Sequence, residues 1–226
     1  MIKAIIFDID DTLYSYKRAH EIAFARMCDY AEQTLGLPAQ TMAADYQAEA
    51  QAMKAYVGGQ AAIHNRLIRF QRILERRKLS LSQARVLDCL YWNTLIAAAE
   101  LEPGCREALD GLKQAGYILG VGTNMTLDWQ LVKLEKLGLL PLMSFVVSSE
   151  EAGVEKPDAR LFALCAQKAG VRPEECLFVG DSLKSDVLGA ENAGMQALWY
   201  APEQTDFSKH PGFSHFSHLQ KLVSMV

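Results

Sequence analysis

The start of the chain places a short apolar segment directly before a group of acidic residues. Residues 2–7 are apolar except for Lys3 and have the length of one β-strand. A segment of this kind is typical of a strand buried on both faces of a parallel sheet. Asp8, Asp10 and Asp11 follow within four residues, so the strand must end at Asp8. Because α/β proteins bind ligands in the loops at the carboxyl ends of parallel strands, we expect a functional site here.

Asp8 and Asp10 are expected to act together. Side chains alternate along an extended segment, so these two carboxylates can point to the same side while Ile9 points away. Neighbouring carboxylates repel each other, and a shared proton or a bound cation relieves that repulsion. An oxygen-rich site with a phosphate group as its partner suits Mg²⁺. The alternative interpretation is a solvated acidic turn in which Thr12 caps a helix.

Residues 15–100 have a helical pattern and contain no β-strand signal. Apolar residues recur at helical spacing, most clearly at Ile63, Leu67, Phe70 and Leu74. We therefore expect an all-helical domain inserted after the first strand, which costs little loop-closure entropy. The expected helices are residues 19–35, 41–56 and 61–77, with a fourth from Ser80 or Ser82 to about residue 98.

From Glu102 onward the pattern alternates between helix and strand. This alternation predicts an α/β fold with an open, doubly wound parallel sheet of five strands. The expected domains are a core of residues 1–14 and 101–226 and the helical insertion of residues 15–100. Residues 203–218 are expected to form an ordered loop before a short terminal helix. The expected strands are residues 117–122, 145–147, 176–179 and 196–200, and the expected helices are residues 105–115, 127–137, 159–169 and 183–193.

Composition excludes several classes of protein. The chain of 226 residues has a net charge of -4, which offers no positive surface to a nucleic-acid polymer. No apolar run approaches the ~20 residues that span a membrane, and no signal-type segment opens the chain. The cysteines form no CxxC pair, so they predict neither a metal cluster nor a disulfide framework, and a cytoplasmic location fits them. They are Cys28, Cys89, Cys105, Cys165 and Cys176.

Polar residues follow the other expected strands as well. Thr123 and Asn124 end the second strand, Asp181 follows the fourth, and Lys156 precedes the helix after the third. In a parallel sheet these ends share one edge, so the residues should converge on Asp8. Carboxylates, a lysine and a hydroxyl group together match phosphoryl transfer, in which charge accumulates on the phosphoryl oxygens. Taken one at a time, each of these residues could instead be a helix cap, part of a surface ion pair or a solvated position on a helix.

Four short motifs of this kind occur in order along the chain. Together they resemble those of the haloacid dehalogenase (HAD) superfamily of phosphohydrolases, and the resemblance covers the whole chain. The helical insertion between the first two motifs looks like the class I cap of that family. The matching segments are Asp8-Ile9-Asp10-Asp11-Thr12 (DxDxT), Gly122-Thr123-Asn124, Glu155-Lys156-Pro157, and Gly180-Asp181-Ser182 through Asp186 (GDSxxxD).

The resemblance implies a Mg²⁺-dependent phosphatase that acts on a small phosphomonoester such as a nucleotide, a sugar phosphate or an acyl-sugar phosphate. Asp8 would be the nucleophile that becomes an aspartyl-phosphate. Asp10 would protonate the leaving oxygen and then take a proton from the hydrolytic water. The side chains of Asp8 and Asp181 and the backbone carbonyl of Asp10 would hold Mg²⁺.

The remaining motif residues would bind the phosphoryl group. By the same resemblance, Thr123 and the backbone of Asn124 contact it, and Lys156 neutralises its charge. Asp186 would orient Lys156 or a metal-bound water rather than ligate the metal directly. Asp11 stands where many members of the family have Gly.

Other reactions of the same family stay open. Haloalkanoate dehalogenases lack the second Asp of the first motif, so Asp10 argues against that activity. A phosphomutase would keep the same core residues and is the first alternative. A phosphonatase, which uses a cap lysine to form an imine, ranks behind it because Lys17, Lys54 and Lys78 lie in no recognisable context.

Two hypotheses come from outside the enzyme class. A response-regulator receiver would carry its phosphorylated Asp after the third strand, where this chain has Ser148 and Ser149. A catalytically inactive binding protein with this fold should have lost one of the motif carboxylates or Lys156, and all are present. A phosphatase is therefore the preferred interpretation, with a small phosphorylated metabolite as its partner.

The expected cap has several arginines on one helix. Arg69, Arg72 and Arg76 fall near one face and could bind a second anionic group of the substrate. We favour the simpler interpretation of a solvated face opposite the apolar stripe. Neither the individual phosphomonoester nor the oligomeric state follows from the sequence.

Overall fold

The computed structural model describes residues 1–201 and 212–226. Within these residues the chain separates into two compact units. The first unit is Met1–Ser15 with Glu100–Val226, and the second is Tyr16–Ala99. A segment after the first strand therefore forms a unit of its own.

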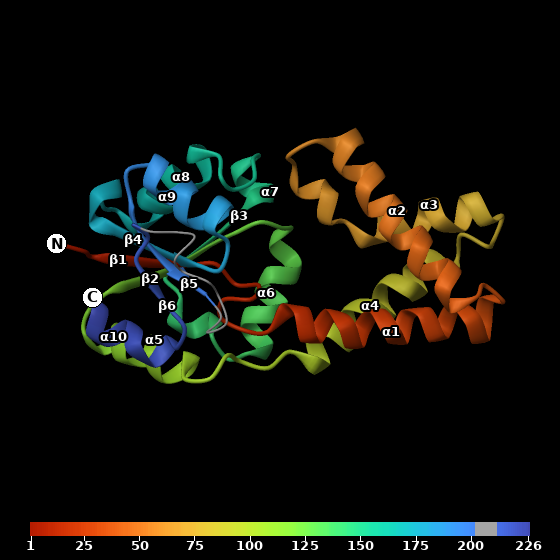
Figure 1. The fold of residues 1–226 in the computed structure, drawn as a ribbon, viewed down its shortest axis with the longest axis horizontal. Helices are drawn as coiled ribbons and strands as arrows, with labels where there is room; N and C mark the ends of the chain where they lie inside the picture. Colours follow the sequence, from red (N-terminus) through yellow and green to blue (C-terminus); the bar gives the residue numbers. More distant parts are fainter. Residues whose placement is uncertain (202–211) are drawn as a thin grey trace. The chain divides into compact units, whose positions relative to one another are not determined.

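The first unit is built on a six-stranded sheet in which all paired strands are parallel (Figure 1). Its strand order is β3-β2-β1-β4-β5-β6, so the winding direction changes at β1. The predicted α/β fold with a doubly wound parallel sheet is confirmed. The strands are β1 (Ala4–Phe7), β2 (Ile118–Thr123), β3 (Phe145–Ser148), β4 (Cys176–Gly180), β5 (Gln196–Tyr200) and β6 (His215–Phe216).

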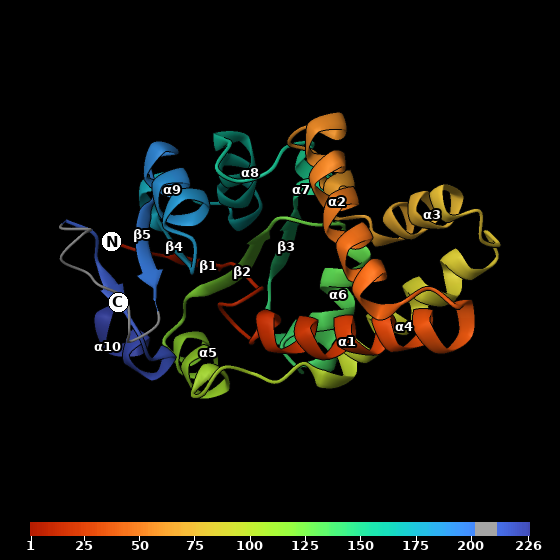
Figure 2. The same ribbon diagram turned by 45° about the vertical axis from the view of Figure 1, so that its right-hand side comes forward.

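Helices cover both faces of this sheet (Figure 2). α8 and α9 pack on one face, where Ile6, Phe162 and Phe178 belong to one buried apolar cluster. α5 and α10 lie on the opposite face. β1 is buried along its whole length, as its apolar sequence predicts. The helices of this unit are α5 (Cys105–Gln114), α6 (Leu127–Lys136), α7 (Ser149–Ala152), α8 (Ala159–Ala169), α9 (Leu188–Asn192) and α10 (Leu222–Met225), with short turns η2 (Leu140–Leu142), η3 (Pro173–Glu175), η4 (Leu183–Val187) and η6 (Leu219–Lys221).

The prediction of five strands was wrong by one. β6 pairs with β5 through His215 and Phe216, within the segment expected to be a loop. Two residues carry no recognisable alternation, so their pairing depends on the exposed edge of β5 rather than on their own pattern. Residues 202–211 of that expected loop lie outside the described part of the chain.

The second unit is entirely helical in its described residues. α1 packs along α4, and α3 packs on both α2 and α4. The expected single helix of residues 61–77 is interrupted, because Asn65 has extended backbone angles and its side chain accepts a hydrogen bond from the Ile68 amide. The helices are α1 (Tyr16–Leu35), α2 (Ala39–Val57), η1 (Ala61–His64), α3 (Arg66–Arg77) and α4 (Gln83–Ala98).

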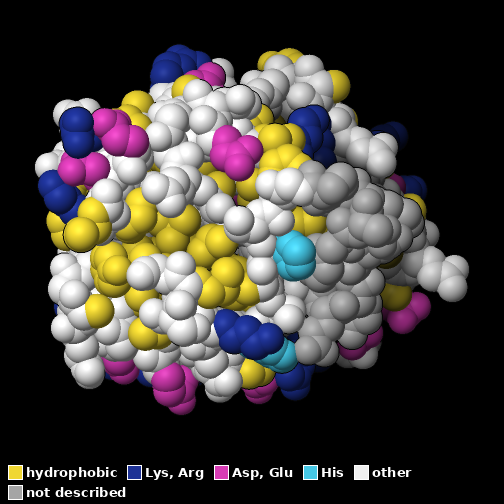
Figure 3. Space-filling view, turned by 60° about the vertical axis from the view of Figure 1, so that its left-hand side comes forward, with side chains coloured by type: hydrophobic (Ala, Val, Ile, Leu, Met, Phe, Trp, Pro, Cys, Tyr) yellow, Lys and Arg dark blue, Asp and Glu magenta, His cyan; other side chains and the backbone are white. Residues whose placement is uncertain are grey.

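No helix among the described residues is long and apolar enough to cross a membrane. One face of the molecule shows a group of hydrophobic side chains with charges of both signs around it (Figure 3). On that face the basic side chains do not form a continuous surface.

The turn after β1 requires a left-handed residue at Asp11. Asp11 has φ of 60°, and its amide donates to the Tyr14 carbonyl at 3.0 Å. Gly adopts this conformation without strain, whereas a Cβ disfavours it, and Asp tolerates it better than most residues. The turn therefore gives a physical reason for a Gly or Asp at this position.

We predict that Asp11→Ala is less stable than Asp11→Gly by about 1 kcal/mol. Both variants lack the carboxylate, so their difference isolates the backbone conformation. Urea unfolding of the two proteins without divalent cations measures it. Equal free energies of unfolding would show that the turn does not impose this conformation.

Candidate active site

Three strands of the first unit end at the same level. Phe7 of β1 pairs with Val121 of β2 and with Val179 of β4. Asp8, Thr123 and the residue after Gly180 therefore leave the sheet side by side, which is the convergence expected from the sequence.

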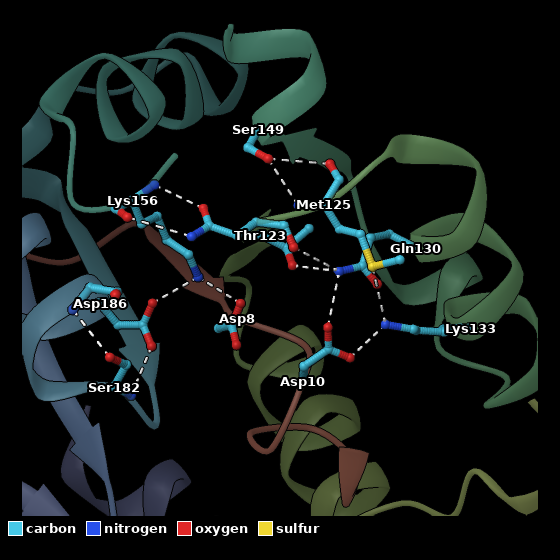
Figure 4. A network of polar contacts seen from close by, with 12 residues as sticks. Asp8, Asp10, Thr123, Met125, Gln130, Lys133, Ser149, Lys156, Ser182 and Asp186 are labelled. Carbon is cyan, nitrogen blue, oxygen red and sulfur yellow. Dashed lines mark hydrogen bonds and ion pairs between the residues drawn. The ribbon is translucent and has the colours of Figure 1, made fainter. Parts of the chain in front are cut away.

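Lys156 lies among the carboxylates at this edge (Figure 4). Its ammonium nitrogen is 2.6 Å from Asp8 Oδ1 and 2.7 Å from Asp186 Oδ1, and the residue is only 6% exposed. Burial opposes the charged form, but Asp186 and Asp8 outweigh it and raise the pKa of Lys156. A lysine buried so deeply is stable only because two carboxylates face it.

Asn124 fixes the backbone that carries this lysine. Its side-chain oxygen accepts from the Lys156 amide at 2.8 Å, and its side-chain nitrogen donates to the Lys156 carbonyl at 3.4 Å. The loop after β2 and the loop before α8 are thereby tied together (Figure 4).

Asp186 reaches the site from a tight turn after β4. Its Oδ2 accepts from the Ser182 amide at 2.9 Å, and η4 is a π-helical turn rather than regular α-helix. The expected helix over residues 183–193 is present as η4 and α9, but hydrogen bonds to Ser182 widen its first turn. Gly180 allows this approach, since a Cβ there would lie 2.6 Å from the Cβ of Asp186.

Three carboxylates face one another here without enough positive charge to balance them. Oxygens of Asp8, Asp181 and Asp186 lie within 4.8 Å of one another, and in the described part of the chain one ammonium group, that of Lys156, pairs with them. Burial, Asp186 and Asp10 raise the pKa of Asp8 to about 7. Burial, Asp8, Asp186 and Asp11 raise the pKa of Asp181 to about 8. When all are ionised the cluster has two excess negative charges and only oxygen donors, so it fits a divalent cation such as Mg²⁺.

The Asp10 side chain belongs to a neighbouring group of residues. Its Oδ1 accepts from the Tyr14 hydroxyl and from Lys133 Nζ, each at 2.6 Å. Gln130 Nε2 lies 3.4 Å from Asp10 Oδ2 and 2.7 Å from Thr123 Oγ1. Burial opposes ionisation, but Lys133, Tyr14 and Gln130 together lower the pKa of Asp10.

Tyr14, Gln130 and Lys133 were not identified from the sequence. Gln130 and Lys133 lie three positions apart on α6, so they share a face of that helix. Both are fully buried, although their residue types are usually exposed. The sequence feature that could have identified them is this pair of polar residues on the first helix after Thr123.

Apart from Asn124, which binds the Lys156 backbone, the sequence-predicted site residues fall into these two groups. Asp8, Asp181, Asp186 and Lys156 come together, while Asp10 and Thr123 are joined through Gln130. The catalytic and ligand roles assigned to them remain predictions.

The preferred interpretation of a solvated face was wrong for Arg69, whereas Arg72 and Arg76 are exposed as expected and form ion pairs. Arg69 is 9% exposed and donates to the Tyr46 hydroxyl and the Ile63 carbonyl. Arg72 pairs with Glu49 at 2.6 Å, and Arg76 pairs with the same carboxylate at 2.9 Å. Helix α2 supplies these acidic partners, which could not be identified without knowing how the helices pack.

Residues 2–194 match the family model of haloacid dehalogenase-like hydrolases. This match spans most of the chain, so the chain belongs to that family. The four motifs indicated the same family.

Two phosphatases are similar in sequence to this chain over most of its length. The ribulose-1,5-bisphosphate 5-phosphatase of Halopiger xanaduensis is 34% identical, over 90% of this chain and 87% of the relative. The glyceraldehyde 3-phosphate phosphatase of Methanopyrus kandleri is 35% identical, over 86% of this chain and 82% of the relative. The predicted enzyme class is confirmed: the chain is a phosphatase of the HAD family.

Solved structures show the same fold. The HAD phosphatase from Thermococcus onnurineus superposes with a TM-score of 0.77 at 23% identity, covering 99% of this chain and 97% of that one. The similarity at this identity concerns the fold alone.

The raised pKa values predict how stability depends on pH in the absence of a divalent cation. Folded Asp8 and Asp181 hold protons up to about pH 7 and 8, whereas the unfolded chain loses them near pH 4. Between these limits the folded state binds more protons, so these two groups lower the free energy of unfolding as pH rises. Urea unfolding in EDTA should show a smaller decrease in Asp181→Asn than in the wild type.

Mg²⁺ should reverse this loss at pH 8, because the cation replaces the protons on the carboxylates. The increase in unfolding free energy should be absent in Asp181→Asn. Equal responses of the variant and the wild type to pH and Mg²⁺ would contradict the assignment of this carboxylate cluster as the cation site.

Proposed function

We propose that this chain is a Mg²⁺-dependent phosphatase that hydrolyses a small phosphorylated sugar through an aspartyl-phosphate on Asp8. One observation carries the proposal: the buried contact of Asp8 with Lys156 at the end of β1, beside Asp181 and Asp186. This contact supports the roles of Asp8 as nucleophile and Lys156 as the cationic partner of the phosphoryl group, next to an acidic cluster. The named substrates of the two relatives support the sugar phosphate class.

In the first step, a carboxylate oxygen of Asp8 attacks phosphorus and the bond from phosphorus to the sugar oxygen breaks. Asp10 gives a proton to that oxygen, so the sugar leaves as a neutral alcohol. Lys156 and the Thr123 hydroxyl interact with the phosphoryl oxygens, where negative charge accumulates. The product of this step is the acyl phosphate of Asp8.

In the second step, water attacks the phosphorus of that acyl phosphate. Asp10 takes a proton from the water, the bond from Asp8 to phosphorus breaks, and inorganic phosphate forms. The hydrogen bonds that lower the pKa of Asp10 prepare it for this role as a base. For the first step, the negative charge of a bound phosphate favours the protonated form of Asp10.

Asp8 and Asp181, with the carbonyl of Asp10, would hold Mg²⁺, and Asp186 would orient Lys156 from the other side. A bound divalent cation supplies positive charge that offsets the negative charge of the phosphate. It also favours ionised Asp8, whose pKa burial, Asp186 and Asp10 otherwise raise.

Residues 15–100 act in this proposal as the cap domain of the family, and 1–14 with 101–226 as the catalytic core. The cap would select the sugar and exclude water from the phosphoryl site. Arg72 and Arg76 already pair with Glu49, which weakens their case as binders of a second anionic group. The five free thiols agree with the cytoplasmic location that the sequence favours.

We predict phosphate release from ribulose 1,5-bisphosphate or glyceraldehyde 3-phosphate in the presence of Mg²⁺. The panel should also contain a nucleoside monophosphate and p-nitrophenyl phosphate, and kcat/KM should rank a sugar phosphate first. EDTA should abolish release, and so should Asp8→Asn, because a carboxamide is a poor nucleophile. Asp110→Asn, at a partly exposed position on α5 where the carboxylate pairs with Arg106, is the matched control and should keep wild-type activity.

Folded protein that hydrolyses none of these compounds would contradict the proposal. Transfer of the phosphoryl group to a second sugar position, without phosphate release, would identify the phosphomutase alternative. Activity that survives in Asp8→Asn would exclude Asp8 as the nucleophile.

A further inference from the structure

Helix α6 presents two buried polar side chains to Asp10 that the reaction above does not use. Lys133 and Gln130 are both 0% exposed. Lys133 Nζ lies 2.6 Å from Asp10 Oδ1 and 5.6 Å from the centroid of the Tyr14 ring, over its face. Gln130 lies between Asp10 and Thr123 (Figure 4).

Burying the charged Lys133 at this position lowers the stability of the folded state unless other interactions compensate. Removing an ammonium group from water costs several kcal/mol, and an apolar side chain of similar volume often serves stability equally well. A role in the neighbouring reaction gives a reason to keep Lys133. The contact with Asp10 indicates which reacting group it serves.

The two oxygens of the Asp10 carboxyl group have different surroundings. Oδ1 accepts two short hydrogen bonds, from Lys133 and from the Tyr14 hydroxyl, each at 2.6 Å. Oδ2 accepts a longer hydrogen bond, from Gln130 Nε2 at 3.4 Å. A proton on Oδ1 would have to displace one of two good donors, whereas a proton on Oδ2 would not.

We propose that Lys133 and Tyr14 are positioning residues that fix Oδ1 of Asp10 and leave Oδ2 as the oxygen that gives and takes the proton. Gln130 aligns Oδ2 with the phosphoryl group, because the same amide nitrogen donates to Thr123 Oγ1 at 2.7 Å. This inference rests on the proposed function, since it concerns the proton transfers of that reaction.

If Lys133 positions Asp10, the loss of rate on replacing Lys133 should depend on the leaving group. An alkoxide leaving from a sugar phosphate needs the proton from Asp10, whereas p-nitrophenolate leaves without it. A displaced Asp10 should therefore slow the first substrate much more than the second. Since kcat/KM covers only the steps up to loss of the leaving group, it separates this proton transfer from the later hydrolysis.

The test compares Lys133→Met with the wild type on one sugar phosphate and on p-nitrophenyl phosphate. Met has a similar length and no charge. We expect kcat/KM to fall about 10- to 100-fold for the sugar phosphate and less than about 3-fold for the aryl phosphate, within the range for general acid catalysis. Lys136→Met, at an exposed position of the same helix, is the matched control and should leave both values unchanged.

Tyr14→Phe provides a second variant with a smaller structural change. It removes one donor to Oδ1 and keeps Lys133, so its loss should have the same dependence on the leaving group and be smaller. If Lys133→Met does not fold, the contrast between the two substrates in Tyr14→Phe decides the proposal.

Equal losses on both substrates, or no loss on either, in the folded variants would overturn the positioning role and leave the phosphatase proposal intact. A wild-type protein that hydrolyses neither substrate would overturn both proposals.

Discussion

The candidate active site depends on a buried excess of negative charge at the edge of a parallel sheet. Asp8, Asp181 and Asp186 face one another, and among the described residues the ammonium of Lys156 pairs with two of these carboxylates. Such a cluster is unfavourable for folding unless protons or a cation neutralise it. The remaining features of the site follow from this constraint: raised carboxyl pKa values, a lysine held on two sides, and a glycine that admits Asp186.

Asp10 lies two residues after Asp8, and its surroundings have the opposite electrostatic effect: they lower its pKa. Lys133, Tyr14 and Gln130 stabilise its charge, whereas Asp186 and burial oppose the charge of Asp8. Two carboxyl groups on one turn thereby acquire different properties from their surroundings. The nucleophile and the acid–base group of the proposed reaction differ in the same way.

The sequence predicted the features that depend on local pattern and strand polarity. A buried strand followed by Asp8 and Asp10, and polar residues after later strands, were sufficient for the sheet and for the convergence of Lys156 with Asp8. Features that depend on packing between distant segments were not predicted. Lys133 lies 123 positions from Asp10, and β6 pairs through only two residues. The ion pairs of Arg72 and Arg76 required the position of α2, which no helical period specifies.

The most direct test of the account is to trap the phosphorylated protein in Asp10→Asn. With p-nitrophenyl phosphate this variant should still form the acyl phosphate, because the leaving group needs no proton, but should hydrolyse it slowly for lack of a base. The account predicts a burst of one nitrophenolate per protein and, after acid quench and peptide mapping, one phosphoryl group on Asp8. A phosphoryl group on another residue, or sustained turnover by Asp10→Asn without labelled protein, would contradict it.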